Sequence, residues 1–168
     1  MRLFLAINPP AEVRRGIWNA TAMIREAAPS VGWVAEPRLH ITLKFLGEHP
    51  ESALEPLVDT MRAIGQLHTP PLARLGGVGA FPNFRRPRVV WIGVDPDPRL
   101  ELLHHDVELA CERLGYPVEG RPFRPHLTLG RITETGSVAQ RRALRTAARK
   151  VRFTDGFPAI AIDMMHTK

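Results

Sequence analysis

Apolar and polar residues follow two spacings along this chain, and the two spacings divide it into helices and strands. Apolar residues three and four positions apart form one face of an α-helix, whereas alternation with polar residues gives a strand two different faces. The first spacing predicts helices over residues 11–28, 51–67, 98–115 and 137–150. The second spacing and short apolar runs predict strands over residues 2–7, 39–46, 89–94, 123–132 and 159–165, shorter extended segments at 31–36 and 72–75, and a glycine-rich turn at 76–79. The predicted class is α+β.

Two of the predicted strands carry nearly the same motif. Residues 39–43 read Leu-His-Ile-Thr-Leu and residues 125–129 read Pro-His-Leu-Thr-Leu. In each half of the chain one predicted helix precedes the motif strand and another follows it, which is typical of an internal duplication. We therefore predict a single domain over residues 1–168, with two pseudo-equivalent lobes that share a cleft and with motif strands near 39–46 and 123–132.

Strand alternation places the histidine and the threonine of each motif on one face. In the first motif strand, the face toward the core takes Leu39, Ile41, Leu43 and Phe45, and the opposite face takes His40, Thr42 and Lys44. In the second motif strand, His126 and Thr128 share a face in the same phase. Two copies in the same phase favour one joint site over two isolated structural histidines.

Charge and cysteine content indicate which kinds of partner and which cellular compartment are expected for this chain. The chain has 23 lysine and arginine residues against 17 aspartate and glutamate residues, a net charge of +6, which favours polyanionic partners and nucleic acid first among them. Cys111 is the only cysteine, which rules out an intrachain disulfide and suits the cytoplasm. The apolar run within residues 1–10 is too short for a signal peptide or a membrane span. We expect a cytoplasmic monomer with no membrane partner.

Two histidines on one surface suit acid–base chemistry at phosphorus. One imidazole can accept a proton from water while the other donates a proton to the leaving oxygen of an in-line displacement. The hydroxyls of Thr42 and Thr128 can hydrogen-bond the non-bridging phosphate oxygens and stabilise the growing charge. This chemistry needs no metal or other cofactor. The competing interpretation is a zinc site, but two histidines fall short of the usual three protein ligands, and His104 and His105 lie apart in a predicted helix.

The motifs, within "LHITLKFLGE" and "RPHLTLGRI", resemble those of the 2H phosphoesterase superfamily. The opening "RLFLAI" and the stretch "GVGAFPNFRRPRVVWIGV" resemble one branch, the bacterial and archaeal RNA 2′,3′-cyclic phosphodiesterases, once called 2′-5′ RNA ligases. The resemblance implies a bilobal, pseudo-two-fold fold in which two antiparallel sheets flank a central basic cleft and helices lie outside. Such proteins usually continue beyond the last strand, whereas this chain ends at Lys168.

The same resemblance implies an activity and roles for four residues. The activity is metal-independent hydrolysis of RNA or nucleoside 2′,3′-cyclic phosphate ends to 2′-phosphomonoesters, with weak reverse 2′-5′ ligation as a side reaction. By position, His40 matches the proton donor and His126 the proton acceptor. Thr42 and Thr128 match the phosphate-binding threonines.

Two charged residues near the motifs are further candidates for substrate binding. Lys44 shares the predicted face of His40, where it either pairs with phosphate or is solvated at the strand end. Simple alternation puts Arg131 on the face opposite His126. A bulge at Gly130 would re-aim Arg131, and the resemblance favours a role in the site.

Aromatic residues are the remaining candidates. Phe84 and Phe123 either stack on a nucleobase or pack within the protein. Trp91 lies in the middle of a predicted strand, where we expect it in the core.

Two other functions stay open from the sequence. One is a phosphodiesterase for small cyclic phosphates, such as cyclic ADP-ribose phosphates. The other is an RNA- or nucleotide-binding module without turnover. The presence of both histidines and both threonines favours catalysis over the binding module.

Overall fold

The computed structural model describes the whole chain except residues 96, 135 and 168. The strands are β1 (Arg2–Ile7), β2 (Gly32–Trp33), β3 (Ile41–Glu48), β4 (Leu72–Phe81), β5 (Val89–Val94), β6 (His126–Arg131), β7 (Thr154–Pro158) and β8 (Asp163–Thr167). The helices are α1 (Ala11–Ala20), α2 (Ala22–Ala27), α3 (Leu54–Leu67), α4 (Pro98–Arg113) and α5 (Val138–Lys150), with short 3₁₀ turns at Glu36–Arg38 and Glu51–Ala53.

The strands form one antiparallel eight-stranded sheet, whose two halves are joined by a single residue pair among the described residues. The strand order is β7-β4-β5-β6-β3-β1-β8, and β2 pairs with β6. Between β3 and β6 the pairing is confined to Ile41 and Leu127 among the described residues. The two halves therefore form two lobes, β7-β4-β5-β6 and β3-β1-β8, joined where the two motifs meet.

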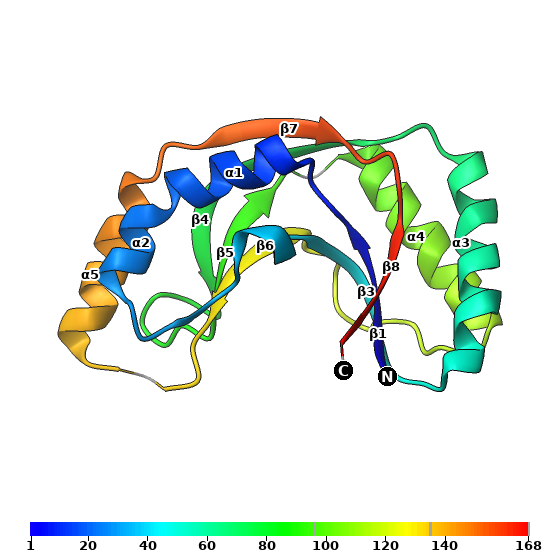
Figure 1. Ribbon diagram of the computed structural model, residues 1–168, viewed down its shortest axis with the longest axis horizontal. Coiled ribbons are helices and arrows are strands. Elements are labelled where there is room, and N and C mark those ends of the chain that lie inside the picture. Colours follow the sequence, from blue (N-terminus) through cyan, green and yellow to red (C-terminus); the bar gives the residue numbers. More distant parts are fainter. Residues whose placement is uncertain (96, 135, 168) are drawn as a thin grey trace.

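Figure 1 shows the sheet as a continuous arch with helices on its outer side. Helices α1, α2 and α5 lie outside the lobe that contains β4 and β5, and α3 and α4 lie outside the lobe that contains β1 and β8. The core lies between the sheet and these helices, where Leu5, Ile17, Leu57 and Leu100 are fully buried. The predicted α+β fold with antiparallel strands and helices outside is confirmed, but the two predicted sheets are the halves of one curled sheet.

Three predicted elements differ from the observed ones. The first predicted helix breaks at Thr21, whose hydroxyl donates to the Ile17 carbonyl at 2.8 Å and so competes with regular helix bonding. The glycine-rich stretch after Leu75 is not a turn but part of β4, and Gly79 leaves the space that the Trp91 ring fills. The last predicted strand, 159–165, begins only at Asp163 and continues to Thr167 as β8, and β7 is a further strand that the pattern does not predict.

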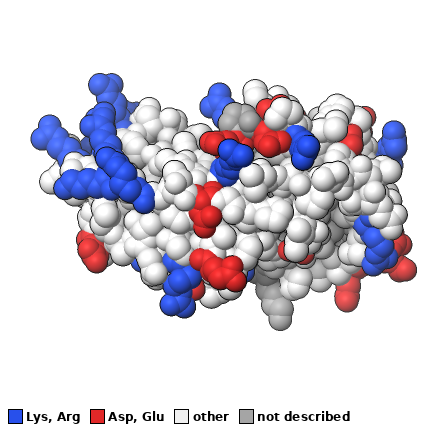
Figure 2. Space-filling view, turned by 90° about the horizontal axis from the view of Figure 1, so that it is seen from above, with Lys and Arg blue, Asp and Glu red and all other residues white. Residues whose placement is uncertain are grey.

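The outer face carries its own concentration of basic side chains. Figure 2 shows lysine and arginine gathered at the end of the molecule where Figure 1 places α5, whereas both signs of charge mix over the rest of this face. The exposed basic residues of α5 are Arg142, Arg145, Arg149 and Lys150. Net charge alone therefore does not locate the site. Within the described part of the chain, no helix is both long and apolar enough to cross a bilayer.

Candidate active site

The two motifs meet at the centre of the arch. Ile41 and Leu127 pair across β3 and β6, and both side chains are fully buried in the core. In an antiparallel pair, the residue before one partner lies across from the residue after the other, and both point to the opposite face. His40 therefore lies across from Thr128 and Thr42 across from His126, on the concave face. The prediction that the motifs come together is confirmed.

Both histidine rings are held by the same backbone contact. Nδ1 of His40 lies 2.7 Å from the Arg38 carbonyl oxygen, and Nδ1 of His126 lies 2.7 Å from the Arg124 carbonyl oxygen. A carbonyl oxygen only accepts hydrogen bonds, so Nδ1 carries the proton in each ring. This assignment leaves Nε2 of each imidazole as the atom that can exchange protons with a substrate.

Aromatic rings flank the two histidines, one set in each lobe. The ring of Phe4 lies 5.1 Å from that of His40, and the ring of Phe81 meets that of His126 at 5.1 Å, edge to face. Trp91 lies 6.4 Å from His126, so its predicted place in the core is wrong. Its neighbours on β5 explain this, because Val90 and Ile92 are the buried residues and Trp91 faces the other way.

A bulge follows the threonine in each motif strand. In β3, Thr42 pairs with Ala6 and Lys44 pairs with Leu5, so Leu43 has no partner on β1. In β6, Thr128 pairs with Trp91 and Gly130 pairs with Val90, so Leu129 is the extra residue. An extra residue reverses the alternation of faces beyond it. The bulges therefore decide which of the next two side chains faces the site.

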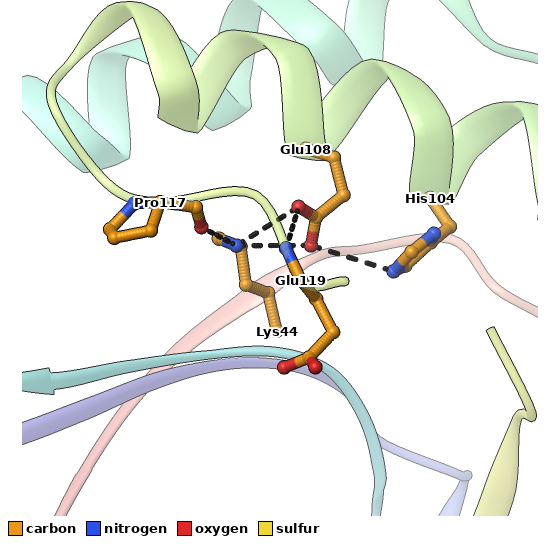
Figure 3. A network of polar contacts seen from close by, with 5 residues as sticks. All are labelled: Lys44, His104, Glu108, Pro117 and Glu119. Carbon is orange, nitrogen blue, oxygen red and sulfur yellow. Dashed lines mark hydrogen bonds and ion pairs between the residues drawn. The ribbon is translucent and has the colours of Figure 1, made fainter. Parts of the chain in front are cut away.

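The bulge at Leu43 overturns two predictions. Lys44 does not share the face of His40: it is 6% exposed, and its Nζ donates to both Glu108 carboxylate oxygens at 3.0 Å and to the Pro117 carbonyl at 2.8 Å (Figure 3). Phe45, predicted to face the core, is 60% exposed. The ring of Phe45 lies 6.0 Å from that of Phe4, on the concave face.

The bulge at Leu129 has the opposite consequence for Arg131. Simple alternation puts this arginine away from His126, but the extra residue returns it to the concave face, paired with Val89 and exposed. The charge of Arg131 acts on His40 from there. The bulge suspected at Gly130 thus lies one residue earlier, with the predicted effect.

The two phenylalanines predicted to stack on a base have protein contacts. Phe84 is partly buried and packs against the hydrophobic core. Phe123 stacks face to face on His104, with 3.8 Å between ring centroids and 3° between planes. One face of the Phe123 ring is therefore covered, and contact of either residue with substrate stays a prediction.

The electrostatics of the site favour an anion. Burial lowers the pKa of His40, the Arg38 carbonyl raises it to a lesser extent, and the nearby charges of Arg14 and Arg131 lower it further. Arg14 is fixed by bonds to the Leu39 carbonyl at 2.9 Å and to Oδ1 of Asn8 at 2.7 Å. A phosphate bound here would be attracted by both guanidinium groups and would favour protonated His40 in turn.

Metal-ligating side chains do not cluster in this arrangement. Across residues 1–95, 97–134 and 136–167, no three histidine, cysteine, aspartate or glutamate side chains come close enough to hold an ion together. Strand pairing instead brings two histidines and two threonines onto one face, a set suited to moving protons and holding phosphate oxygens.

The arch with a histidine and a threonine from each lobe defines a class, the two-lobed phosphoesterases with paired His-x-Thr motifs. The chain belongs to the 2′-5′ RNA ligase superfamily, whose pattern matches residues 12–166. It is 39% identical over 138 residues to an RNA 2′,3′-cyclic phosphodiesterase of Thermus thermophilus, covering 78% of this chain and 68% of that one.

Two more comparisons agree with this assignment. An RNA 2′,3′-cyclic phosphodiesterase of Geobacillus stearothermophilus is 34% identical over 143 residues, 85% of this chain, but this chain spans only 46% of that relative. The crystal structure of a Thermus thermophilus protein superimposes with a TM-score of 0.78 at 30% identity, covering all of this chain and 89% of that one.

Proposed function

We propose that this protein hydrolyses the 2′,3′-cyclic phosphate ends of RNA and of nucleosides to 2′-phosphomonoesters, without a metal ion. The observation that carries the proposal is the pairing of Ile41 with Leu127, because it brings two histidines and two threonines from distant parts of the chain onto one face. The sequence relatives described above are named RNA 2′,3′-cyclic phosphodiesterases, which supports RNA as the substrate class.

The proposed reaction is a single in-line displacement at phosphorus. Nε2 of His126 takes a proton from water as the water oxygen bonds to phosphorus. The bond from phosphorus to O3′ breaks, and Nε2 of His40 gives its proton to O3′, leaving a 2′-phosphate and a free 3′-hydroxyl. Thr42 and Thr128 donate hydrogen bonds to the non-bridging oxygens, whose charge grows in the transition state. A 5′-hydroxyl in place of water would give 2′-5′ ligation by the same steps.

The lowered pKa of His40 fits the donor role once substrate is bound. In the free protein, burial and two guanidinium charges favour neutral His40. The negative charge of the bound phosphodiester offsets these effects and favours the imidazolium form.

The test is to identify the product made from defined substrates. Purified protein is incubated, in excess EDTA, with the four nucleoside 2′,3′-cyclic phosphates and with an oligonucleotide ending in a cyclic phosphate. We expect turnover to 2′-phosphates, resolved from 3′-phosphates by phosphorus NMR. A 3′-phosphate product, or activity restored only by added zinc or manganese, would overturn the mechanism. Binding of these compounds without turnover would favour a binding module, and turnover of cyclic ADP-ribose phosphates alone would favour a small-molecule phosphodiesterase.

A further inference from the structure

We infer that His104 of α4 is a positioning residue for the acceptor histidine, because it holds the segment that fixes the ring of His126. The ring of His104 stacks on that of Phe123. The residue after Phe123 is Arg124, whose carbonyl oxygen lies 2.7 Å from Nδ1 of His126. The inference rests on the proposed function for its effect on the rate, whereas its effect on the His126 ring is measurable in the free protein.

The segment before His126 differs in backbone structure from the equivalent segment of the first motif. The carbonyl that holds His40 belongs to Arg38, which lies in a 3₁₀ turn. Residues 116–125, by contrast, form neither helix nor strand. The position of the Arg124 carbonyl therefore depends on the contacts that the side chains of α4 make with this segment.

The start of this segment is held by a buried ion pair. Glu108 of α4 accepts a hydrogen bond from the backbone N–H of Glu119 at 3.0 Å. Lys44, which is paired with Glu108, donates to the Pro117 carbonyl at 2.8 Å (Figure 3). Both charged side chains are 6% exposed. The beginning of the segment is thus attached both to α4 and to the first motif strand.

The end of the segment is held by the ring of His104. This residue lies one turn before Glu108 on the same face of α4, and its ring stacks on Phe123 with 3.8 Å between centroids and 3° between planes. Burial lowers the pKa of His104, and the Glu108 carboxylate offsets only part of this effect, so the neutral imidazole is favoured. An uncharged planar ring of another kind should therefore replace it.

The first experiment separates kcat from KM on adenosine 2′,3′-cyclic phosphate. It compares wild type with His104→Ala, with His104→Phe, and with His105→Ala as the matched control, an exposed histidine at the next position of α4. His104→Ala should lower kcat about 10- to 100-fold and leave KM nearly unchanged, because a slightly misplaced general base loses much of its effect. His104→Phe keeps the stack, so it and His105→Ala should behave like wild type.

The second experiment asks whether His104 acts through His126. In a protein that already carries His126→Ala, adding His104→Ala should cause no further loss of rate, since residues that act as a unit are not additive. Nitrogen NMR of the His126 ring measures its tautomer in the free protein. Wild type, His104→Phe and His105→Ala should carry the proton on Nδ1, and His104→Ala should show a mixture of tautomers.

Several results would overturn this role. These are an unchanged kcat or an unchanged His126 tautomer in His104→Ala, an equal loss in His104→Phe, a loss confined to KM, or a full further loss when His104→Ala is added to His126→Ala. Urea unfolding shows which variants are folded in the assay, and His104→Leu, which fills the space without a planar ring, replaces His104→Ala if that variant is not. If wild type does not hydrolyse the substrate, the proposed function fails, and the His126 tautomer still decides the positioning role.

Discussion

The strand pairs β1–β3 and β5–β6 present the two halves of the site on closely similar backbones. Each half has a histidine whose Nδ1 bonds the carbonyl two residues earlier, a threonine two residues later, and a bulge at the next leucine. Beyond the bulge the halves diverge, since Lys44 and Phe45 occupy the positions of Gly130 and Arg131. We expect the shared part to supply the chemistry at phosphorus, and the divergent part to account for differences between the two halves.

The first position after each bulge points into the protein, and the two lobes fill this space differently. Gly130 leaves room for the ring of Trp33, which a Cβ at this position would overlap. Lys44 instead forms a buried ion pair with Glu108, which also accepts from the backbone N–H of Glu119 at 3.0 Å (Figure 3). The ion pair thus ties the motif of one lobe to the segment that leads to His126 in the other.

The largest effect on the reaction rate should come from replacing the histidines, and a modified leaving group should distinguish the roles of His40 and His126. Replacing His40 or His126 by alanine should each lower the rate by roughly 10²–10⁴, the usual worth of general acid–base catalysis. A substrate whose O3′ is replaced by sulfur needs little protonation on leaving. It should largely rescue His40→Ala and leave His126→Ala impaired in steady-state assays.

Rescue of His126→Ala instead would exchange the donor and acceptor roles of the two histidines. Failure of the sulfur substrate with both variants would mean that the rings act mainly by binding phosphate.

Breaking the buried ion pair should give the next largest effect, on stability. Lys44→Met leaves the Glu108 carboxylate without its main cation, which typically costs about 3–5 kcal/mol for a buried pair. The double variant Lys44→Met with Glu108→Leu should recover most of this loss, because no unpaired charge remains. Urea unfolding measures both, with Arg62→Met, in an exposed pair with Asp59, as the control. A loss in the double variant as large as in Lys44→Met would show that packing, not charge, stabilises this position.

Substitution of the two threonines tests whether both lobes contribute equally to stabilising the phosphate in the transition state. Thr42→Val and Thr128→Val remove one donor each while keeping the shape, and each should slow the reaction by about 10²–10³. Serine at either position keeps the hydroxyl and should be much milder. We expect similar losses in the two lobes, measured as kcat/KM on one substrate. If valine and serine variants behave alike, the hydroxyls do not contact the phosphate.

Sequence alternation located the four motif residues correctly, because each motif keeps a regular two-residue repeat up to its threonine. It failed two and three residues after Thr42, for Lys44 and Phe45. A leucine after the threonine continues the alternating pattern in both motifs, so nothing in the residues themselves marks Leu43 and Leu129 as unpaired. The bulges depend on the partner strands β1 and β5, which are far away in sequence.

Other residues show the same limit of local patterns. The face of Trp91 could be predicted from the sequence, since Val90 and Ile92 on either side of it occupy the core face of β5. The contacts of Phe4 and Phe81 with the histidines could not be predicted, because they depend on strand pairing between distant segments. Glu108 had no local signal either, as it meets Lys44 only when α4 packs behind β3.

The smallest predicted effect is on the pH dependence, and it sharpens the electrostatic difference between the lobes. Burial and the charges of Arg14 and Arg131 lower the pKa of His40 in the free protein. An NMR titration of the His40 imidazole should therefore show loss of its proton at lower pH than in an ordinary histidine. Binding of a nucleoside 2′-phosphate should move this titration to higher pH, because the anion favours the imidazolium form. Arg131→Gln removes one cation and should move the titration in the free protein to higher pH, whereas Arg131→Lys should leave it in place. An unchanged titration in Arg131→Gln, or a shift to lower pH, would mean that the charge of Arg131 does not act on His40.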